Sequence, residues 1–256
     1  MPRILALLFS LILAGAAWAQ DTNLRILNTG DDTKGWGAVG RLELEGRGFC
    51  TGALIAPDLV LTAAHCLFDR HSGERLDTSQ VEFRAGWRNG RAEAYRSVRR
   101  AVVHPQYSFD GTAGASRVLN DLALLKLHHP IQGTGIVPFE IAGRIRKGTK
   151  IGVVSYAVGR EEAPSYQEKC RLMGRQKGVY VMSCDVDFGS SGAPVFAFED
   201  GEVRIASVVS AKADFKGQKV SLGMGLDGPI DQLMAELNTA RIASKRTVGG
   251  ARFVKP

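Results

Sequence analysis

The sequence predicts an all-β protein made of two similar β-units, with one helix near the C-terminal end. The main observation is a series of short runs rich in β-branched and aromatic residues, separated by Gly, Asn, Asp and Pro. Regularly spaced short strands with turn signals are typical of sandwiches and barrels rather than of βαβ units. About six such runs fall on each side of residue 130, so we expect two units that join there.

The first unit is expected at about residues 36–130 and the second at about 131–228. In the first unit, strands are predicted at residues 39–44, 49–55, 59–62, 81–85, 97–103 and 122–127. In the second unit, strands are predicted at residues 137–141, 151–158, 179–185, 194–198, 204–209 and 220–225.

A helix is predicted at about residues 229–243. Asp227 can cap it, and Pro229 suits the first helical position. A single apolar stripe then follows at helical spacing, formed by Ile230, Leu233, Met234 and Leu237. We expect the basic, glycine-containing residues 244–256 to form a flexible tail.

The N-terminal residues have the features of a secretory signal peptide. Arg3 supplies a positive charge, residues 4–16 form an apolar run, and Ala17-Trp18-Ala19 fits a cleavage site. The apolar run is too short to span a bilayer comfortably. We therefore expect cleavage near Ala19, a folded domain over residues 20–243, and a secreted or periplasmic location without a stable membrane anchor.

Four cysteines, Cys50, Cys66, Cys170 and Cys184, lie in the exported part of the chain. An even number in an oxidising compartment predicts two disulfides, and four cysteines allow three pairings. The local pairs Cys50–Cys66 and Cys170–Cys184 are favoured, because each sits on a hairpin or strand–loop unit. Each would stabilise the fold by about 3 kcal/mol in the chain-entropy model. No C-x-x-C sequence occurs and no histidine is spaced as a partner ligand, so we do not expect a metal site. We expect no cofactor either.

The formal net charge of +7 does not predict a nucleic-acid partner. Removal of Arg3 with the signal peptide leaves a net charge of +6, and five units of this excess come from basic residues of the C-terminal stretch, which contains no acid. Those five residues are Arg241, Lys245, Arg246, Arg252 and Lys255. The folded body is therefore close to neutral, and a basic tail of this kind is usually solvated.

A histidine follows an apolar run in the segment Val60-Leu61-Thr62-Ala63-Ala64-His65-Cys66. Small residues crowd around His65, and Cys66 can tether it to Cys50. A lone histidine is more often structural than catalytic, and the disulfide and tight turn favour a catalytic role.

An acid stands at the start of a very hydrophobic strand in the segment 120–127, NDLALLKL. Asp121 is either a turn residue at the strand start or a buried carboxylate that orients an imidazole.

A serine between glycines occurs in the segment 189–194, GSSGAP. Such a turn can direct backbone N–H groups into a cleft, and we expect those of Gly189 and Ser191 to form an oxyanion hole.

Together these three segments resemble the trypsin-like (chymotrypsin-fold) serine peptidases. The order His, Asp, Ser is the order of that family. Its TAAHC stands at residues 62–66, its NDLALLKL-type strand at 120–127, and its GDSGGP at 189–194 with two changes. The resemblance runs from about Trp36 through the expected C-terminal helix. It implies two antiparallel six-stranded β-barrels with the site in the cleft between them.

The resemblance also implies the site residues and their roles. His65 would be the general base and then the general acid, Asp121 would orient it, and Ser191 would be the nucleophile. The implied activity is that of a secreted serine endopeptidase, a monomer that acts on protein or peptide substrates.

Ser190 departs from the animal pattern, in which an aspartate pairs with an N-terminal amine released by zymogen cleavage. A serine makes no such ion pair, and the stretch 24–27 is a weak match to an activation site. The altered segment is closer to the bacterial glutamyl-endopeptidase branch. We therefore expect an oxyanion loop organised without that ion pair, and Arg25 to be dispensable for activity.

Substrate preference has conflicting indications. Asp185 lies six residues before Ser191, as does the pocket-base aspartate of trypsin, which favours Arg or Lys at the cleaved bond. Ser210 and Lys212 match the family's substrate-binding strand, and Lys212 would instead favour acidic groups.

Two other functions compete with an active peptidase. An α/β-hydrolase elbow is disfavoured, because that fold needs its histidine after the serine and all five histidines precede Ser191. A catalytically inactive relative that acts as a binding or adaptor protein stays open, because the oxyanion segment is altered.

Overall fold

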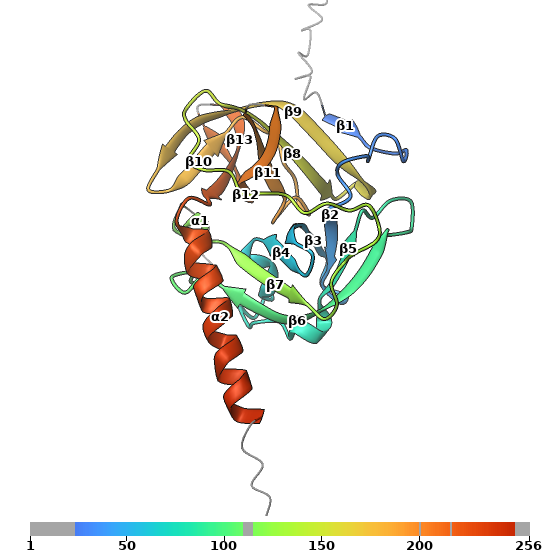
Figure 1. Cartoon of the computed structure of the whole chain (residues 1–256). Helices are drawn as coiled ribbons and strands as arrows, with labels where there is room; N and C mark the ends of the chain where they lie inside the picture. The colour runs from blue at the N-terminus through green and yellow to red at the C-terminus, as the bar shows by residue number, and fades with distance from the viewer. Residues whose placement is uncertain (1–23, 110–114, 200, 216, 249–256) are drawn as a thin grey trace, which may run out of the picture.

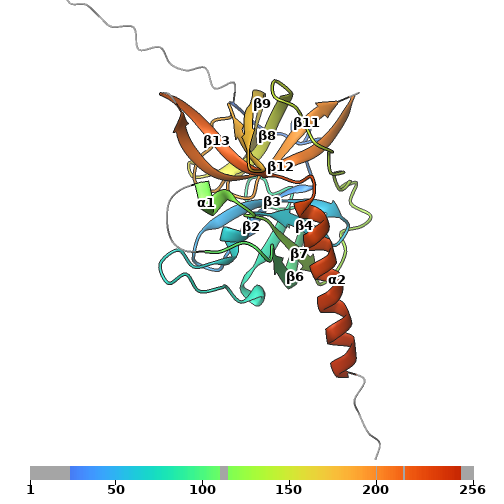
Figure 2. The ribbon, with the colours of Figure 1, turned by 90° about the vertical axis from the view of Figure 1, so that its left-hand side faces the viewer.

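The structure is a computed structural model that describes residues 24–109, 115–199, 201–215 and 217–248. Two β-structures stack on one another, and a C-terminal helix runs along the lower one (Figure 1). The view turned by 90° shows the same stacking and the same helix at the edge (Figure 2). This arrangement confirms the all-β prediction.

The lower structure is a closed six-stranded barrel in the order β2-β3-β4-β7-β6-β5. Its strands are antiparallel and match the six predicted ones within three residues at each end. They are β2 (Val39–Glu43), β3 (Phe49–Ala56), β4 (Leu59–Thr62), β5 (Glu82–Ala85), β6 (Ala94–Val103) and β7 (Ala123–Leu127). Two 3₁₀ turns, η1 (Ala64–Leu67) and η2 (Thr78–Gln80), and the one-turn helix α1 (Ala115–Val118) lie in the connections.

The upper structure is a seven-stranded antiparallel sheet in the order β1-β9-β10-β13-β12-β11-β8. Its strands are β1 (Leu24–Ile26), β8 (Lys150–Ala157), β9 (Arg160–Gln176), β10 (Val179–Met182), β11 (Pro194–Glu199), β12 (Glu202–Phe215) and β13 (Gln218–Gly225). Because β8 also pairs with β9, strands β8 to β13 form a complete circuit of six. Strand β1 is an additional partner at the start of β9.

The second unit differs from the sequence prediction in several details. Strand β10 ends three residues earlier than predicted and β12 ends six residues later. Residues 137–141 form no strand, and in this stretch only Ile141 makes a single bridge, to Ile205. Its place in the unit is taken by β9, which the sequence analysis did not identify. The seven acidic and basic side chains of β9 alternate with buried residues only in part, and Pro164 interrupts the run, so the period-2 pattern is weak.

The C-terminal helix α2 (Pro229–Val248) begins where predicted and ends five residues later than predicted. Residues 244–248 contain no Gly or Pro, and the first glycine after the helix is Gly249, so the chain has no reason to leave the helical conformation earlier. Leu233 and Leu237 are buried against the lower barrel, whereas Met234 is 38% exposed. The rest of the predicted tail, 249–256, lies outside the described residues, as does the predicted signal peptide 1–19.

No helix among the described residues is long and apolar enough to cross a membrane.

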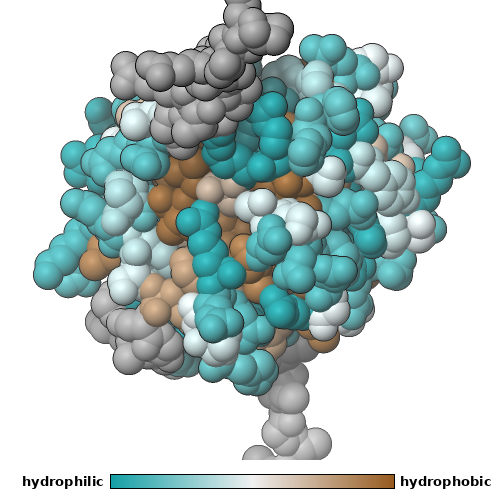
Figure 3. Space-filling view, turned by 90° about the horizontal axis from the view of Figure 1, so that it is seen from below, coloured by the Kyte–Doolittle hydropathy of each residue, from teal (hydrophilic) through white to brown (hydrophobic). Residues whose placement is uncertain are grey.

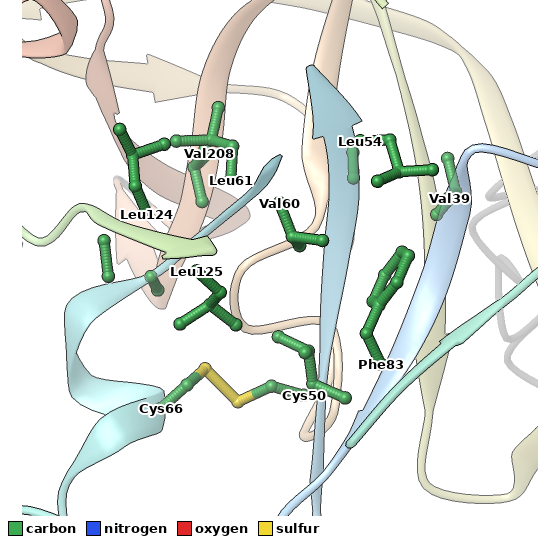
Figure 4. Close-up of a cluster of buried hydrophobic side chains, with 14 of the residues drawn as sticks. Val39, Cys50, Leu54, Val60, Leu61, Cys66, Phe83, Leu124, Leu125 and Val208 are labelled. Atoms are coloured by element: carbon green, nitrogen blue, oxygen red, sulfur yellow. A yellow bond between two sulfur atoms is a disulfide. The ribbon is translucent and has the colours of Figure 1, made fainter. Parts of the chain in front are cut away.

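A continuous core joins the two β-structures. The main cluster of buried side chains contains residues of both, for example Leu61 and Leu124 from the lower barrel and Val208 from β12. Figure 4 shows Val208 beside Leu61 and Leu124, above the Cys50–Cys66 disulfide. A second cluster fills the upper structure alone. Because apolar packing continues across the boundary, the two units are fixed relative to each other.

The lower face of the molecule is hydrophilic at its rim, with hydrophobic residues gathered near its centre (Figure 3).

The two disulfides of the described chain are Cys50–Cys66 in the lower barrel and Cys170–Cys184 in the upper structure. These are the two local pairs that the sequence favoured.

Candidate active site

His65 and Asp121 lie in direct contact. His65 belongs to the 3₁₀ turn η1, which follows β4, and Asp121 lies two residues before β7. The imidazole Nδ1 lies 2.7 Å from Asp121 Oδ2, and the backbone N–H of His65 donates to Asp121 Oδ1 at 2.8 Å. Strands β4 and β7 are neighbours in the barrel, which brings together two residues that are 56 positions apart.

Asp121 is fully buried and has a third hydrogen-bond donor. The Ser210 hydroxyl of β12 donates to Asp121 Oδ2. Ser210 was predicted to bind substrate, and its hydroxyl reaches the carboxylate from the other barrel. No sequence signal pointed to this contact, because the two residues are 89 positions apart.

Ser191 lies in the turn that immediately precedes β11. Gly189 and Gly192 flank this turn with positive φ angles of 94° and 79°, a conformation that residues with a Cβ rarely adopt. Thr51 of β3 holds the turn from the other barrel. Its hydroxyl donates to the Gly189 carbonyl at 2.9 Å, and its N–H donates to the Ser191 carbonyl at 2.8 Å. No sequence signal predicted these contacts, because Thr51 lies 138 positions before Gly189.

The backbone N–H groups of Gly189 and Ser191 have no hydrogen-bond acceptor among residues 24–109, 115–199, 201–215 and 217–248. The neighbouring N–H groups do have acceptors: Ser190 donates to the Asp187 carbonyl and Gly192 to the Val209 carbonyl. The turn therefore keeps two backbone donors available, and they are the two that the sequence predicted for an oxyanion hole.

Ser190 is fully buried and makes only neutral contacts in the described chain. Its hydroxyl lies 3.1 Å from the Ser155 hydroxyl and donates to the Tyr156 carbonyl at 3.4 Å. Both partners belong to β8. Ser190 is therefore held against β8 by uncharged hydrogen bonds.

Two cavities meet at His65. The larger, of about 650 Å³, is lined by His65, Ser191, the strand β12 from Val209 to Ala213, and the side chains of Arg70 and Phe188. The smaller, of about 390 Å³, shares His65 with the larger one and is lined by Phe49, the Cys50–Cys66 disulfide and Gly189. Together they form a cleft between the two barrels that passes over the His65 and Ser191 side chains.

The three residues expected to bind substrate are only partly brought together. Ser210 and Lys212 line the larger cavity with Ser191, whereas Asp185 lines a neighbouring cavity of about 470 Å³. Lys212 Nζ lies 2.8 Å from Asp187 Oδ1. The hydrogen bond from Lys212, together with one from the backbone of Phe188, lowers the pKa of Asp187, so this acid stays ionised near neutral pH.

Arg160 lies at the cavity that contains Asp185. Burial lowers the pKa of its guanidinium, although an arginine stays charged in proteins. Its Nη1 is buried and has no hydrogen-bond partner in the part of the chain that the structure describes. Arg160 was not predicted as a site residue, because it lies outside the three sequence segments that contain His65, Asp121 and Ser191.

His65, Cys50 and Cys66 carry ligand-type atoms that lie close together, but they do not make a metal site. Both sulfur atoms belong to the disulfide, and a metal requires the thiolate.

Comparisons with known proteins agree with this geometry. The family model described as Trypsin matches residues 30–218. A glutamyl endopeptidase of Bacillus licheniformis is 27% identical over 150 residues, which cover 58% of this chain and 45% of that protein. A trypsin of Phaedon cochleariae is 36% identical over 84 residues, which cover 32% of this chain and 29% of that protein. The chain thus spans less than half the length of these curated relatives.

A solved structure of a Glu endopeptidase in complex with MPD shares the fold. Its TM-score is 0.62 at 17% sequence identity, and the match covers 81% of this chain and 91% of that one. This similarity confirms the predicted chymotrypsin-like architecture.

Proposed function

Because the chain belongs to the trypsin family of serine peptidases, we propose that it is a secreted endopeptidase that hydrolyses peptide bonds through an acyl-enzyme intermediate. We assign Ser191 as the nucleophile, His65 as the general base and then the general acid, and Asp121 as the residue that orients His65. The observation that carries the proposal is the hydrogen-bonded His65–Asp121 pair in the cleft that Ser191 also lines.

The contacts of Asp121 support its role. With Nδ1 of His65 held by the carboxylate, the other ring nitrogen is the one available to Ser191. The same carboxylate stabilises the imidazolium that forms when His65 takes the serine proton. The Ser210 hydroxyl and the His65 backbone N–H fix the carboxylate in turn, so we treat Ser210 as a positioning residue.

The free donors of Gly189 and Ser191 support an oxyanion hole. Loss of one such donor costs about 3–4 kcal/mol of transition-state stabilisation in a serine peptidase. This contribution depends on the turn being preorganised, which here comes from Thr51 on one side and from the Ser190–β8 contacts on the other.

Strand β12 offers a site for an extended peptide. From Ser210 onward its strand partner among the described residues is β13 alone, since the pairing with β11 ends at Val208. A strand edge with free backbone groups binds an extended chain by adding it as a further strand. We therefore propose that the acyl part of the substrate lies along Ser210–Lys212.

For the residue before the cleaved bond we propose an acidic side chain. The names of two of the similar proteins, glutamyl endopeptidase and Glu endopeptidase, support this preference. Arg160 supports it as well, because it lines the neighbouring cavity and its guanidinium carries the positive charge that attracts a carboxylate. A peptide library profiled for cleavage tests the preference, and predominant cleavage after Lys or Arg would assign Asp185 as the determinant instead.

Secretion rests on the N-terminal sequence alone, with its positive charge, apolar run and cleavage site. N-terminal sequencing of the protein recovered outside the cytoplasm tests it, with a first residue near Gln20 expected.

Labelling with a fluorophosphonate probe tests the mechanism. We expect a covalent adduct on Ser191 that is lost in Ser191→Ala and in His65→Ala, while the neighbouring variant Ser190→Ala still labels. Peptide hydrolysis should fall by at least about 10³-fold in the first two variants. A folded wild-type protein that neither labels nor cleaves would instead support an inactive relative that acts as a binding protein.

A further inference from the structure

Arg70 occupies a place in the cleft that the catalytic assignment does not use. It follows His65 by five residues and lines both cavities that meet at His65. Its guanidinium carbon lies 5.8 Å from the centre of the Phe188 ring, which belongs to the opposite barrel. Arg70 is itself exposed, so its charge faces the open cleft rather than the protein interior.

The charge of Arg70 is not matched by an acid among the described residues. The acid nearest to it in sequence is Asp69, whose Oδ1 accepts the backbone N–H groups of His71 and Ser72 at 2.9 Å. These two hydrogen bonds lower the pKa of Asp69, and its Oδ2 lies 3.4 Å from Arg47 Nε. Asp69 is therefore engaged by its own loop and by Arg47.

The other acid of the cleft is also engaged, since Asp187 pairs with Lys212. The two cavities together are lined by four cationic side chains, those of Arg47, Arg70, Arg117 and Lys212, and by the two acids Asp69 and Asp187. By contrast, the cavity that contains Asp185 has three acids and three bases in its lining. The excess of positive charge is therefore a property of the cleft around His65 and not of the whole region.

The geometry assigns the smaller cavity to the leaving group. In the proposed mechanism the acyl part lies along β12, which lines the larger cavity with Ser191. The leaving amine takes its proton from His65, so the residues after the cleaved bond must continue past the imidazole. On that side lie Gly189, the Cys50–Cys66 disulfide and Arg70, all of which line the smaller cavity.

We propose that Arg70 selects substrates with a carboxylate side chain at the first or second position after the cleaved bond (P1′ or P2′). The cation stands at the border of the leaving-group cavity, has no acid partner in the described chain, and lies in a cleft whose low-dielectric walls strengthen its field. This inference rests on the proposed peptidase function. It adds a residue that determines specificity on the leaving-group side of the cleaved bond, which is released when the acyl-enzyme forms.

Internally quenched peptides that differ only after the cleaved bond test the proposal. The acyl part is fixed to the best sequence from the library, and P1′ and P2′ are set together to Glu, Gln or Lys. We expect kcat/KM to be about fivefold higher for the Glu peptide than for the Gln peptide, as for one partly exposed ion pair, and lower still for the Lys peptide. The ratio should decline as salt is raised, because the Debye length shortens.

Three variants identify the residue. In Arg70→Gln the Glu-to-Gln ratio should fall to about 1, and in Arg70→Glu the Lys peptide should become the best substrate. Arg117→Gln removes a cation that lines only the larger cavity, so it should keep the wild-type ratio.

Fluorophosphonate labelling separates this proposal from the proposed function, because the probe has no peptide on its leaving-group side. We expect Arg70→Gln to label at the wild-type rate. A labelled wild-type enzyme with a Glu-to-Gln ratio of 1, or a ratio that survives in Arg70→Gln, would overturn the inference alone. A protein that neither labels nor cleaves any peptide would overturn the proposed function and the inference with it.

Discussion

The uncharged packing of Ser190 leads to a quantitative prediction about an aspartate at this position. In Ser190→Asp a carboxylate would replace a fully buried side chain whose hydrogen-bond partners among the described residues are the Ser155 hydroxyl and the Tyr156 carbonyl. Ser190→Asn has nearly the same size and no charge, so the difference between the two variants isolates the cost of the buried charge.

Burial without a cation disfavours the ionised form, and therefore raises the pKa of the introduced carboxyl above about 3.9, its value in the unfolded chain. The folded state then holds a proton that the unfolded state has lost, so stability falls as pH rises between the two pKa values. For an increase of about 2–3 pKa units, at about 1.4 kcal/mol per unit, the loss at pH 7 is about 3–4 kcal/mol.

Urea unfolding followed by tryptophan fluorescence at several pH values measures this difference. We expect Ser190→Asp and Ser190→Asn to have similar free energies of unfolding near pH 3.5 and to diverge by about 3–4 kcal/mol at pH 7. Equal stability at pH 7 would show that a cation reaches the carboxylate, and would refute our conclusion that the oxyanion turn is organised without an ion pair. Arg25→Gln should meanwhile leave kcat/KM unchanged, because Arg25 pairs with Asp32 on the surface.

Three further outcomes follow from the geometry. Gly192→Ala should lower the free energy of unfolding in urea by about 3 kcal/mol or more and abolish labelling, since φ is +79° and a Cβ would overlap oxygen atoms of β3 and β4. Gly35→Ala is the control, because its φ is +86° and the space around it is open. Its free energy of unfolding should fall only by the strain of the positive φ. Replacing Cys50 and Cys66 by serine should cost about 3 kcal/mol by calorimetry, because the disulfide closes a 16-residue loop; an unchanged Tm would contradict this. Burial lowers the pKa of His104 from 6.5, so the unfolded chain binds the proton first as pH falls. The stability of the folded protein should therefore decrease below about pH 6.5. Measurements of Tm over a pH series should show a smaller decrease for His104→Asn than for the wild type.

Much of the fold was predictable, because the period-2 alternation and the turn residues are local features. The strand at Leu59–Thr62 was predicted to the residue, and the start of the final helix at Pro229 was marked by its cap and its proline. Strand β9 was missed because charged residues and Pro164 obscure its alternation. Strand β1 was missed because three residues carry no pattern of their own, and their pairing with Tyr166 and its neighbours defines them.

By itself, the sequence determined which chemistry this chain could carry, because a histidine beside a cysteine, an acid before an apolar strand and a serine between glycines are each readable from neighbouring residues. Only the tertiary structure decided how that chemistry is supported. The Ser210–Asp121 hydrogen bond, the hold of Thr51 on the Ser191 turn and the two cavities at His65 each join residues from both barrels. Such contacts depend on how one barrel packs against the other, and no local pattern of residues encodes that packing.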